Sequence, residues 1–153
     1  MIHTNENILH SNYQYIAHQC NCVSKNSAGL AKSIFEKYPY SNIYQNREKN
    51  DSPGNIIISG NGDDQRYIIN MLSQFYPGTP KYETYEQRLG WFKSCILKIS
   101  EIKNINQIAF PFNIGCGLAG GKWEDYENLI SFLDNYCEVF ICKIQWYISI
   151  YEV

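Results

Sequence analysis

The hydrophobic periodicity of this chain changes repeatedly along its length, and this alternation constrains the fold more than any other feature. Short apolar runs, typical of β-strands, are separated by segments whose apolar residues recur every three or four positions, as in amphipathic helices. The pattern predicts strands at 15–20, 55–59, 67–72, 107–112 and 144–151, helices at 27–38, 83–103 and 123–136, and a short helix followed by a loop within 41–54. Strands that alternate with helices predict one α/β domain with helices on both faces of a mixed sheet.

The length and charge of the chain limit its function. It has 153 residues, the size of a single domain, and we expect one domain over 1–153. Its 13 basic and 15 acidic side chains give a net charge of −2, without the excess of positive charge that binds a phosphate backbone. A hydrophobic share of 44% and a charged share of 18% are typical of a packed domain. We therefore expect a monomer that does not bind nucleic acid.

The N-terminal segment and the cysteines bear on location and cofactors. Residues 1–7 lack the basic start and apolar core of a signal peptide, and no run approaches the length of a membrane span. We expect a cytoplasmic or nucleocytoplasmic protein that does not bind a membrane, with its six cysteines reduced. Cys20-x-Cys22 and Cys137-x4-Cys142 lack the C-x2-C spacing and the nearby histidine of a zinc site. We therefore expect no metal and no cofactor.

A glycine-rich segment, 115–121, separates the predicted strand 107–112 from the next helix. Such a loop can point its backbone N–H groups into a concavity that suits phosphate. Its G-x-G-x-x-G pattern is not that of a dinucleotide-binding fold, because such a fold carries the pattern near its start and continues with several strands. A Walker A loop is excluded because Trp123 replaces the required Ser or Thr. Cys116 lacks the arginine of a cysteine phosphatase loop, since Lys122 stands in its place. A tight packing turn remains the alternative.

A second polar motif lies at the end of the predicted strand 15–20. The sequence His18-Gln19-Cys20-Asn21-Cys22 leads into the small residues Ala28-Gly29-Leu30-Ala31. Ligands of open α/β sheets bind at the carboxyl ends of strands, so we expect this motif and the glycine loop to face one crevice. The alternatives are a structural histidine at position 18 and an Asx cap at position 21.

Together these motifs resemble the macro domain family, whose members bind ADP-ribose. The early stretch 18–31 resembles the first signature of the family, and Pro111-Phe112-Asn113-Ile114-Gly115-Cys116-Gly117-Leu118 with Gly120-Gly121 and Trp123 resembles the second. The resemblance extends over nearly the whole chain and is strongest to the small stand-alone members, which include ADP-ribose-1″-phosphate phosphatases and glutamate-releasing ADP-ribose glycohydrolases. It implies a three-layer α/β/α fold with a mixed central sheet.

The resemblance also implies a role for individual residues. Asn7 and Ile8 would contact the adenine, and Tyr151 would lie beside it. Asn21 would contact the distal ribose. Gly29 and Leu30 would lie under the diphosphate and the distal ribose, and the glycine loop would surround the phosphates. The expected ligand-binding residues are Asn7, Ile8, Asn21, Gly29, Leu30, Ala31, Pro111, Asn113, Ile114, Gly115, Cys116, Gly117, Leu118, Ala119, Gly120 and Tyr151.

The catalytic residues of the glutamate-releasing group are missing. That group uses a lysine that attacks the sugar carbon and an aspartate in the glycine loop, whereas this chain has Asn70-Met71-Leu72 and Ala119 at those positions. His18 is the candidate catalytic residue, because imidazole is a general acid or base near neutral pH.

The expected reaction is hydrolysis of ADP-ribose-1″-phosphate to ADP-ribose and phosphate, with His18 orienting the attacking water or protonating the leaving group. The alternatives are a non-catalytic ADP-ribose reader and a hydrolase that removes ADP-ribose without the Lys/Asp pair. The expected partners are ADP-ribose or its derivatives and ADP-ribosylated proteins.

Overall fold

The computed structural model describes residues 1–143, which form a six-stranded sheet in the order β1-β6-β5-β2-β4-β3. The strands are β1 (Ile2–Thr4), β2 (Tyr15–Cys20), β3 (Ile56–Ser59), β4 (Tyr67–Leu72), β5 (Gln107–Pro111) and β6 (Glu138–Cys142). Neighbouring strands are parallel except for the antiparallel hairpin β3–β4, so the predicted mixed sheet is confirmed.

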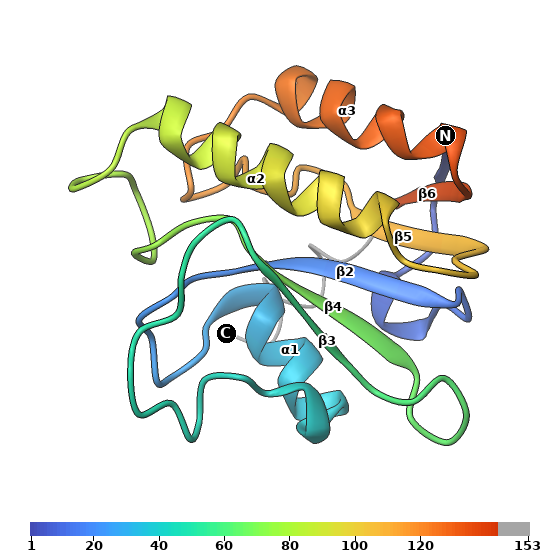
Figure 1. Ribbon diagram of the computed structural model, residues 1–153, viewed down its shortest axis with the longest axis horizontal. Helices are drawn as coiled ribbons and strands as arrows, with labels where there is room; N and C mark the ends of the chain where they lie inside the picture. The colour runs from blue at the N-terminus through green and yellow to red at the C-terminus, as the bar shows by residue number, and fades with distance from the viewer. Residues whose placement is uncertain (144–153) are drawn as a thin grey trace.

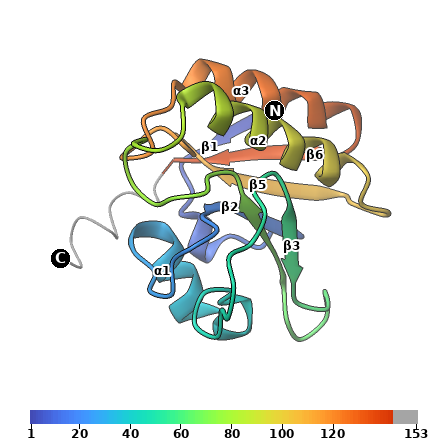
Figure 2. The same cartoon turned by 60° about the vertical axis from the view of Figure 1, so that its left-hand side comes forward.

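Helices cover both faces of this sheet, which confirms the predicted three layers. Helix α1 (Gly29–Lys37) lies on one face, while α2 (Tyr85–Ser100) and α3 (Trp123–Ser131) lie side by side on the other (Figures 1 and 2). Three short 3₁₀ helices complete the described elements: η1 (Ile8–His10), η2 (Pro39–Ser41) and η3 (Phe132–Asn135). No helix within residues 1–143 is long and apolar enough to cross a membrane.

The core has two parts, one on each face of the sheet. Successive side chains of a strand point to opposite faces, so Ile16 of β2 packs in the cluster under α1, whereas Ala17 packs in the cluster under α2 and α3. Phe92 and Ile96 of α2 are buried in that second cluster. The central strands are continuous apolar runs because both of their faces are covered.

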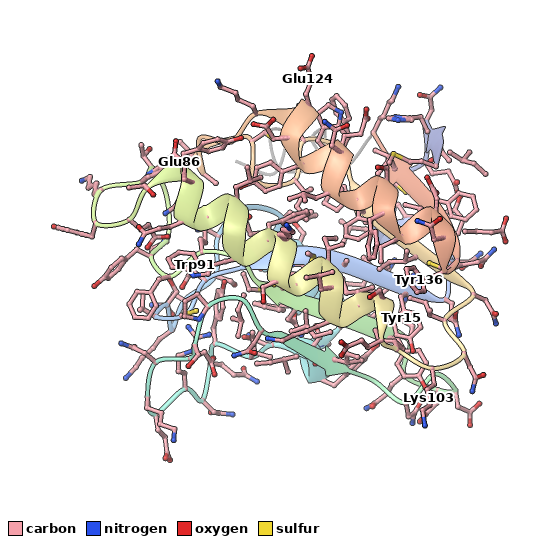
Figure 3. The ribbon with its side chains drawn as sticks, turned by 45° about the horizontal axis from the view of Figure 1, so that its top comes forward. Tyr15, Glu86, Trp91, Lys103, Glu124 and Tyr136 are labelled. Atoms are coloured by element: carbon pink, nitrogen blue, oxygen red, sulfur yellow. The ribbon has the colours of Figure 1, made fainter. Side chains whose placement is uncertain are left out.

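Helices α2 and α3 begin at the same end of the molecule, beyond the carboxyl ends of the strands. Figure 3 shows Glu86 and Glu124 near the first turns of the two helices. The start of α2 is fixed by a capping box in which the Thr84 hydroxyl accepts from the Gln87 N–H and the Gln87 side chain accepts from the Thr84 N–H. The loops that enter both helices therefore meet at one edge of the sheet.

The structure corrects the predicted elements in three regions. No helix forms between residues 42 and 54, where only turns and bends follow η2. The prediction missed β6, which begins soon after η3 ends, and it missed β1, a three-residue strand whose side chains are mostly exposed. The strand predicted at 144–151 lies outside the described residues.

Candidate functional site

A cavity of about 520 Å³ opens at the carboxyl ends of β2, β4 and β5. The strand order places β5 on one side of β2 and β4 on the other, so the loops after these strands diverge and leave a crevice. The cavity brings both sequence motifs together, and the predicted residues that line it are His18, Asn21, Gly29, Leu30, Ala31, Pro111, Asn113, Ile114, Gly115, Gly117, Leu118 and Ala119.

Other predicted residues do not line this cavity. Cys116 and Gly120 belong to the glycine loop but are not among its lining residues. Asn7 is not among them either, and its side chain accepts the N–H of Leu9 at 3.0 Å and caps η1. Ile8 is fully buried in the core under α1. Tyr151 lies outside the described residues.

The sequence interpretation missed several lining residues. Pro77 and Gly78 follow β4, and the rule that ligands bind at carboxyl ends of strands could have indicated them. Gln74 also follows β4, whereas no local motif marks Tyr44. The remaining lining residues not predicted as site residues are Gln19, Cys20, Ser24, Asn26, Ala28 and Phe112.

The glycine loop contains backbone N–H groups without a partner in residues 1–143, at positions that line the cavity. The N–H groups of Cys116, Gly120 and Gly121 donate to the carbonyl groups of Asn113, Gly117 and Gly115, at 2.9, 3.0 and 2.8 Å. Within the described residues, no hydrogen bond is made by the N–H groups of Gly115, Gly117, Leu118 and Ala119, and these same four residues line the cavity. Unpaired N–H groups around a concavity form a site for an anion.

The start of α1 supplies a second set of unpaired donors. Its N-cap residue, Ala28, makes no side-chain capping bond, and the N–H groups of Gly29, Leu30 and Ala31 have no acceptor within the described residues. All four residues line the cavity. A helix N-terminus carries a partial positive charge, so an anionic ligand placed there is stabilised.

Glycine is required at the base of the loop for steric reasons. Gly115 has a φ of +74°, and a Cβ at this position would lie 2.6 Å from Cε1 of Tyr126. A Cβ at Gly121 would lie 2.4 Å from the Gly115 carbonyl oxygen. The Tyr126 ring is buried against Phe92, so it cannot easily yield, and the loop must pass directly over it.

A buried ion pair ties this loop to the loop after β4. The side chains of Glu83 and Arg88 are 4% and 1% exposed, and Arg88 Nε donates to Glu83 Oε2 at 2.7 Å. The Arg88 guanidinium also donates to the carbonyl groups of Tyr76, Gly78 and Ala119 at 2.9, 2.7 and 3.1 Å. One charged side chain therefore fixes two walls of the cavity.

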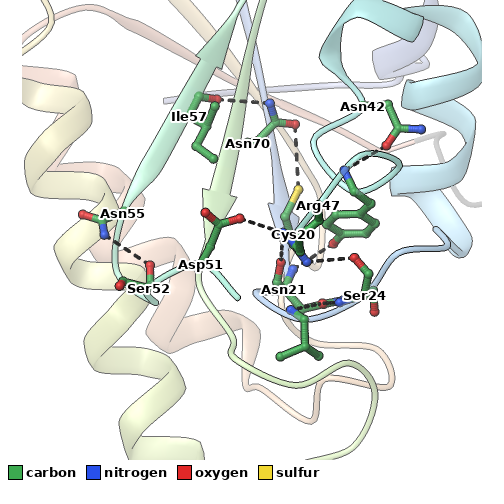
Figure 4. Close-up of polar contacts among 12 residues, drawn as sticks. Cys20, Asn21, Ser24, Asn42, Arg47, Asp51, Ser52, Asn55, Ile57 and Asn70 are labelled. Carbon is green, nitrogen blue, oxygen red and sulfur yellow. Dashed lines mark hydrogen bonds and ion pairs between the residues drawn. The ribbon is translucent and has the colours of Figure 1, made fainter. Parts of the chain in front are cut away.

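Asn21 shapes the turn between β2 and α1. Its Oδ1 accepts the N–H groups of Val23 and Ser24 at 3.1 and 2.8 Å, so the Asx interpretation holds for its oxygen. Arg47 supports this turn by donating to the carbonyl groups of Asn21 and Ser24, and it pairs with Asp51 at 2.9 Å (Figure 4). The Nδ2 group of Asn21 makes no hydrogen bond within residues 1–143, so a ligand can use it.

His18 lines the cavity but is almost fully buried under α1, against the Phe35 ring. Its Nε2 lies 2.7 Å from Asn70 Oδ1. The Nδ2 of Asn70 donates to the Ile57 carbonyl and the Ser59 hydroxyl, so Oδ1 must be the acceptor and the proton lies on His18 Nε2 (Figure 4 shows the bond from Asn70 to Ile57). Burial lowers the pKa of His18 to about 4, and the Asn70 bond offsets only part of this shift. His18 is therefore neutral at pH 7.

The cavity is lined without charged side chains. None of its described lining residues is Asp, Glu, Lys or Arg. The residues that the resemblance places at the position of the catalytic lysine, Asn70-Met71-Leu72, are buried within β4, whereas Gln74, beyond the end of that strand, lines the cavity. Within residues 1–143, no cluster of three or more His, Cys, Asp or Glu side chains could hold a metal ion.

These observations define a three-layer α/β/α domain with an uncharged cavity that suits an anionic ligand. Comparison with known proteins identifies the family. The family model of the macro domain matches residues 17–130, and the chain belongs to this family.

The chain is similar to an uncharacterized 17.5 kDa protein of Enterobacteria phage T4, with 25% identity over 142 residues, 86% of this chain and 85% of the phage protein. Its fold is similar to that of the macrodomain of Mycobacterium tuberculosis DarG, with a TM-score of 0.73 and 19% identity over 92% of this chain and 95% of that one. It is also similar to Thermosipho africanus DarTG in complex with ADP-ribose, with a TM-score of 0.62 and 19% identity over 90% of this chain and 39% of that one.

Proposed function

We propose that this macro domain binds ADP-ribose, with the diphosphate between the start of α1 and the glycine loop. The observation that carries this proposal is the convergence of two sets of unpaired backbone N–H groups on one cavity. Backbone donors hold phosphate without any basic side chain, which agrees with a cavity that has none.

The size and lining of the cavity support the same ligand. A volume of about 520 Å³ lies in the usual range for small-molecule sites. Apolar residues such as Ile114 and Leu118 offer surface for the ribose and the base, while Asn21 Nδ2 offers a donor for a ribose hydroxyl. The structurally similar Thermosipho africanus DarTG is a complex with ADP-ribose, which supports this choice.

A charge placed at the start of α1 tests the binding mode. Ala31 lines the cavity in the first turn of the helix, where an acidic side chain favours the helix itself. Ala31→Glu should preserve the melting temperature but lower the affinity for ADP-ribose at least about 10-fold in calorimetric titration, because its carboxylate competes with the diphosphate. Ala31→Gln, the uncharged control of the same size, should lose much less. Equal affinity of the two variants would contradict this placement.

For the reaction, we propose hydrolysis of ADP-ribose-1″-phosphate. The oxygen of a water molecule attacks the phosphorus, the bond from phosphorus to the 1″ oxygen breaks, and the water proton passes through a phosphoryl oxygen to the 1″ oxygen. The products are ADP-ribose and inorganic phosphate. Because His18 is neutral, it suits accepting a hydrogen bond from the water at Nδ1, and not protonating the leaving group.

A substrate panel tests the reaction and separates it from the alternatives. Phosphate release from ADP-ribose-1″-phosphate should be about 100-fold slower in His18→Gln than in the wild type, because the attacking water loses its orientation and a misplacement of about 1 Å can cost about 100-fold in rate. Tight binding of ADP-ribose without turnover of any substrate would favour a reader. Release of ADP-ribose from modified protein alone would favour a de-ADP-ribosylating hydrolase.

A further inference from the structure

Three side chains at the carboxyl ends of β2 and β4 form a hydrogen-bonded chain. The Ser73 hydroxyl donates to Gln19 Oε1 at 2.9 Å, and Gln19 Nε2 donates to Gln74 Oε1 at 2.6 Å. Gln19 and Gln74 line the cavity, while Ser73 is fully buried behind them. The chain joins the ends of β2 and β4, the two strands that meet there.

The direction of this chain of bonds follows from its buried end. The only other acceptor near the Ser73 hydroxyl among residues 1–143 is the Met71 carbonyl at 3.5 Å. The hydroxyl therefore donates to Gln19 Oε1, which is closer. Gln19 must then turn its oxygen toward Ser73 and its nitrogen toward Gln74. Gln74 in turn accepts through its oxygen and keeps its NH₂ group for the cavity. The network thus presents two N–H donors to a ligand.

The position of this donor group indicates which part of the ligand it meets. Gln19 Oε1 lies 3.2 Å from the site that a Cβ of Gly115 would occupy, at the base of the glycine loop. Gln19 also stands two residues before Asn21, which the binding mode proposed above places on the distal ribose. In that binding mode Gln74 therefore lies between the base of the glycine loop and the Asn21 turn, where the distal ribose is placed.

From this arrangement we infer that Gln74 selects the group attached to the distal ribose. This inference rests on the proposed binding of ADP-ribose. A side chain that offers only donors favours substituents rich in acceptor oxygens, above all a phosphate ester, because charged acceptors form the stronger hydrogen bonds. It disfavours a guanidinium or amine link, which would oppose donor to donor. Since no lining residue is basic, an uncharged donor such as this amide has to discriminate between these groups.

The test compares two ligands, ADP-ribose and ADP-ribose-1″-phosphate, by calorimetric titration in the His18→Gln background so that turnover does not consume the phosphate ester. In Gln74→Met, which removes the donors but keeps the volume, the affinity ratio in favour of the 1″-phosphate should fall about 10-fold, the size of one lost bond to a charged group. In Gln74→Glu it should fall further. The affinity for ADP-ribose itself should change less than about 3-fold.

Two further variants complete the design. Gln45→Glu adds the same charge at an exposed glutamine outside the cavity and should leave the ratio unchanged. Gln19→Leu should lower the ratio although Gln74 is intact, because the amide is no longer oriented, and this marks Gln19 as a positioning residue. An unchanged ratio in both Gln74 variants, with ADP-ribose still bound, would overturn the role of Gln74 alone. Failure of the wild-type protein to bind ADP-ribose would overturn the proposed function as well.

Discussion

The buried pair Glu83–Arg88 should be essential for the stability of the walls of the cavity. Glu83 accepts three donors: the N–H groups of Phe75 and Tyr76, each at 3.0 Å, and Arg88 Nε at 2.7 Å. Glu83→Gln turns one acceptor oxygen into an NH₂ group and leaves the Arg88 charge buried among carbonyl groups. Loss of one partner of a buried pair costs about 3–5 kcal/mol. At about 2–4 °C per kcal/mol for a chain of this length, the melting temperature should fall by about 6–20 °C.

Thermal unfolding followed by circular dichroism measures this effect, with Glu86→Gln as the control. Glu86 is exposed in the first turn of α2, the helix that carries Arg88, and should change stability by no more than about 0.5 kcal/mol. The double variant Glu83→Gln/Arg88→Met should be at least about 1 kcal/mol more stable than the two single losses predict, because the second change removes the charge that the first left unpaired. A melting temperature for Glu83→Gln within about 2 °C of the control, or additive losses, would refute the reasoning.

Two further predictions concern a titration and a turn. The pKa of His18 is lowered from 6.5 to about 4, so the unfolded chain binds more protons than the native one between these values. The free energy of unfolding is therefore not reduced by His18 above pH 6.5, and it falls by about 3 kcal/mol as the pH decreases toward 4, because the native state must keep this imidazole neutral. Urea titrations at several pH values should show this decrease in the wild type but not in His18→Gln. Gly115 and Gly78 share a φ of +74°, but only Gly115 would place a Cβ against Tyr126. Gly115→Ala should therefore destabilise by about 1–3 kcal/mol more than Gly78→Ala, and equal losses in denaturant titrations would show that the clash is relieved.

The sequence predicted the central elements of the fold because packing on both faces makes their patterns strong. β2 and β4 coincide with the predicted runs 15–20 and 67–72, whose residues are almost all buried. The failures lie where local signals are weak. β1 has only three residues and pairs with β6, a strand far away in sequence, so no local pattern reports the pairing.

The site divides in the same way. The unpaired backbone N–H groups of the glycine loop and of the start of α1 could be predicted, because such a site needs glycine and small residues close together in sequence. The side chains that fix these loops could not be predicted. In the sequence Arg47 and Arg88 resemble ordinary surface charges, and only the fold buries them against carbonyl groups. Gln74 was missed for a related reason, since the role proposed for it depends on hydrogen bonds among Gln19, Ser73 and Gln74 that form only once β2 pairs with β4.

The net charge of −2 and a phosphate-binding role are compatible because the positive potential in the cavity comes from the backbone. Arg47 and Arg88 do not compensate the ligand directly, since carbonyl and carboxylate groups occupy their guanidinium groups. They act indirectly, because they hold the two loops in conformations that leave backbone N–H groups unpaired. A backbone N–H group is fixed in position, whereas a lysine side chain can change its rotamer. A site made of backbone donors therefore favours ligands whose phosphates have a matching, fixed spacing over other anions. In the proposed binding mode the cavity wall is uncharged, so the bound group would be selected by Gln74 and the attacking water would be oriented by His18.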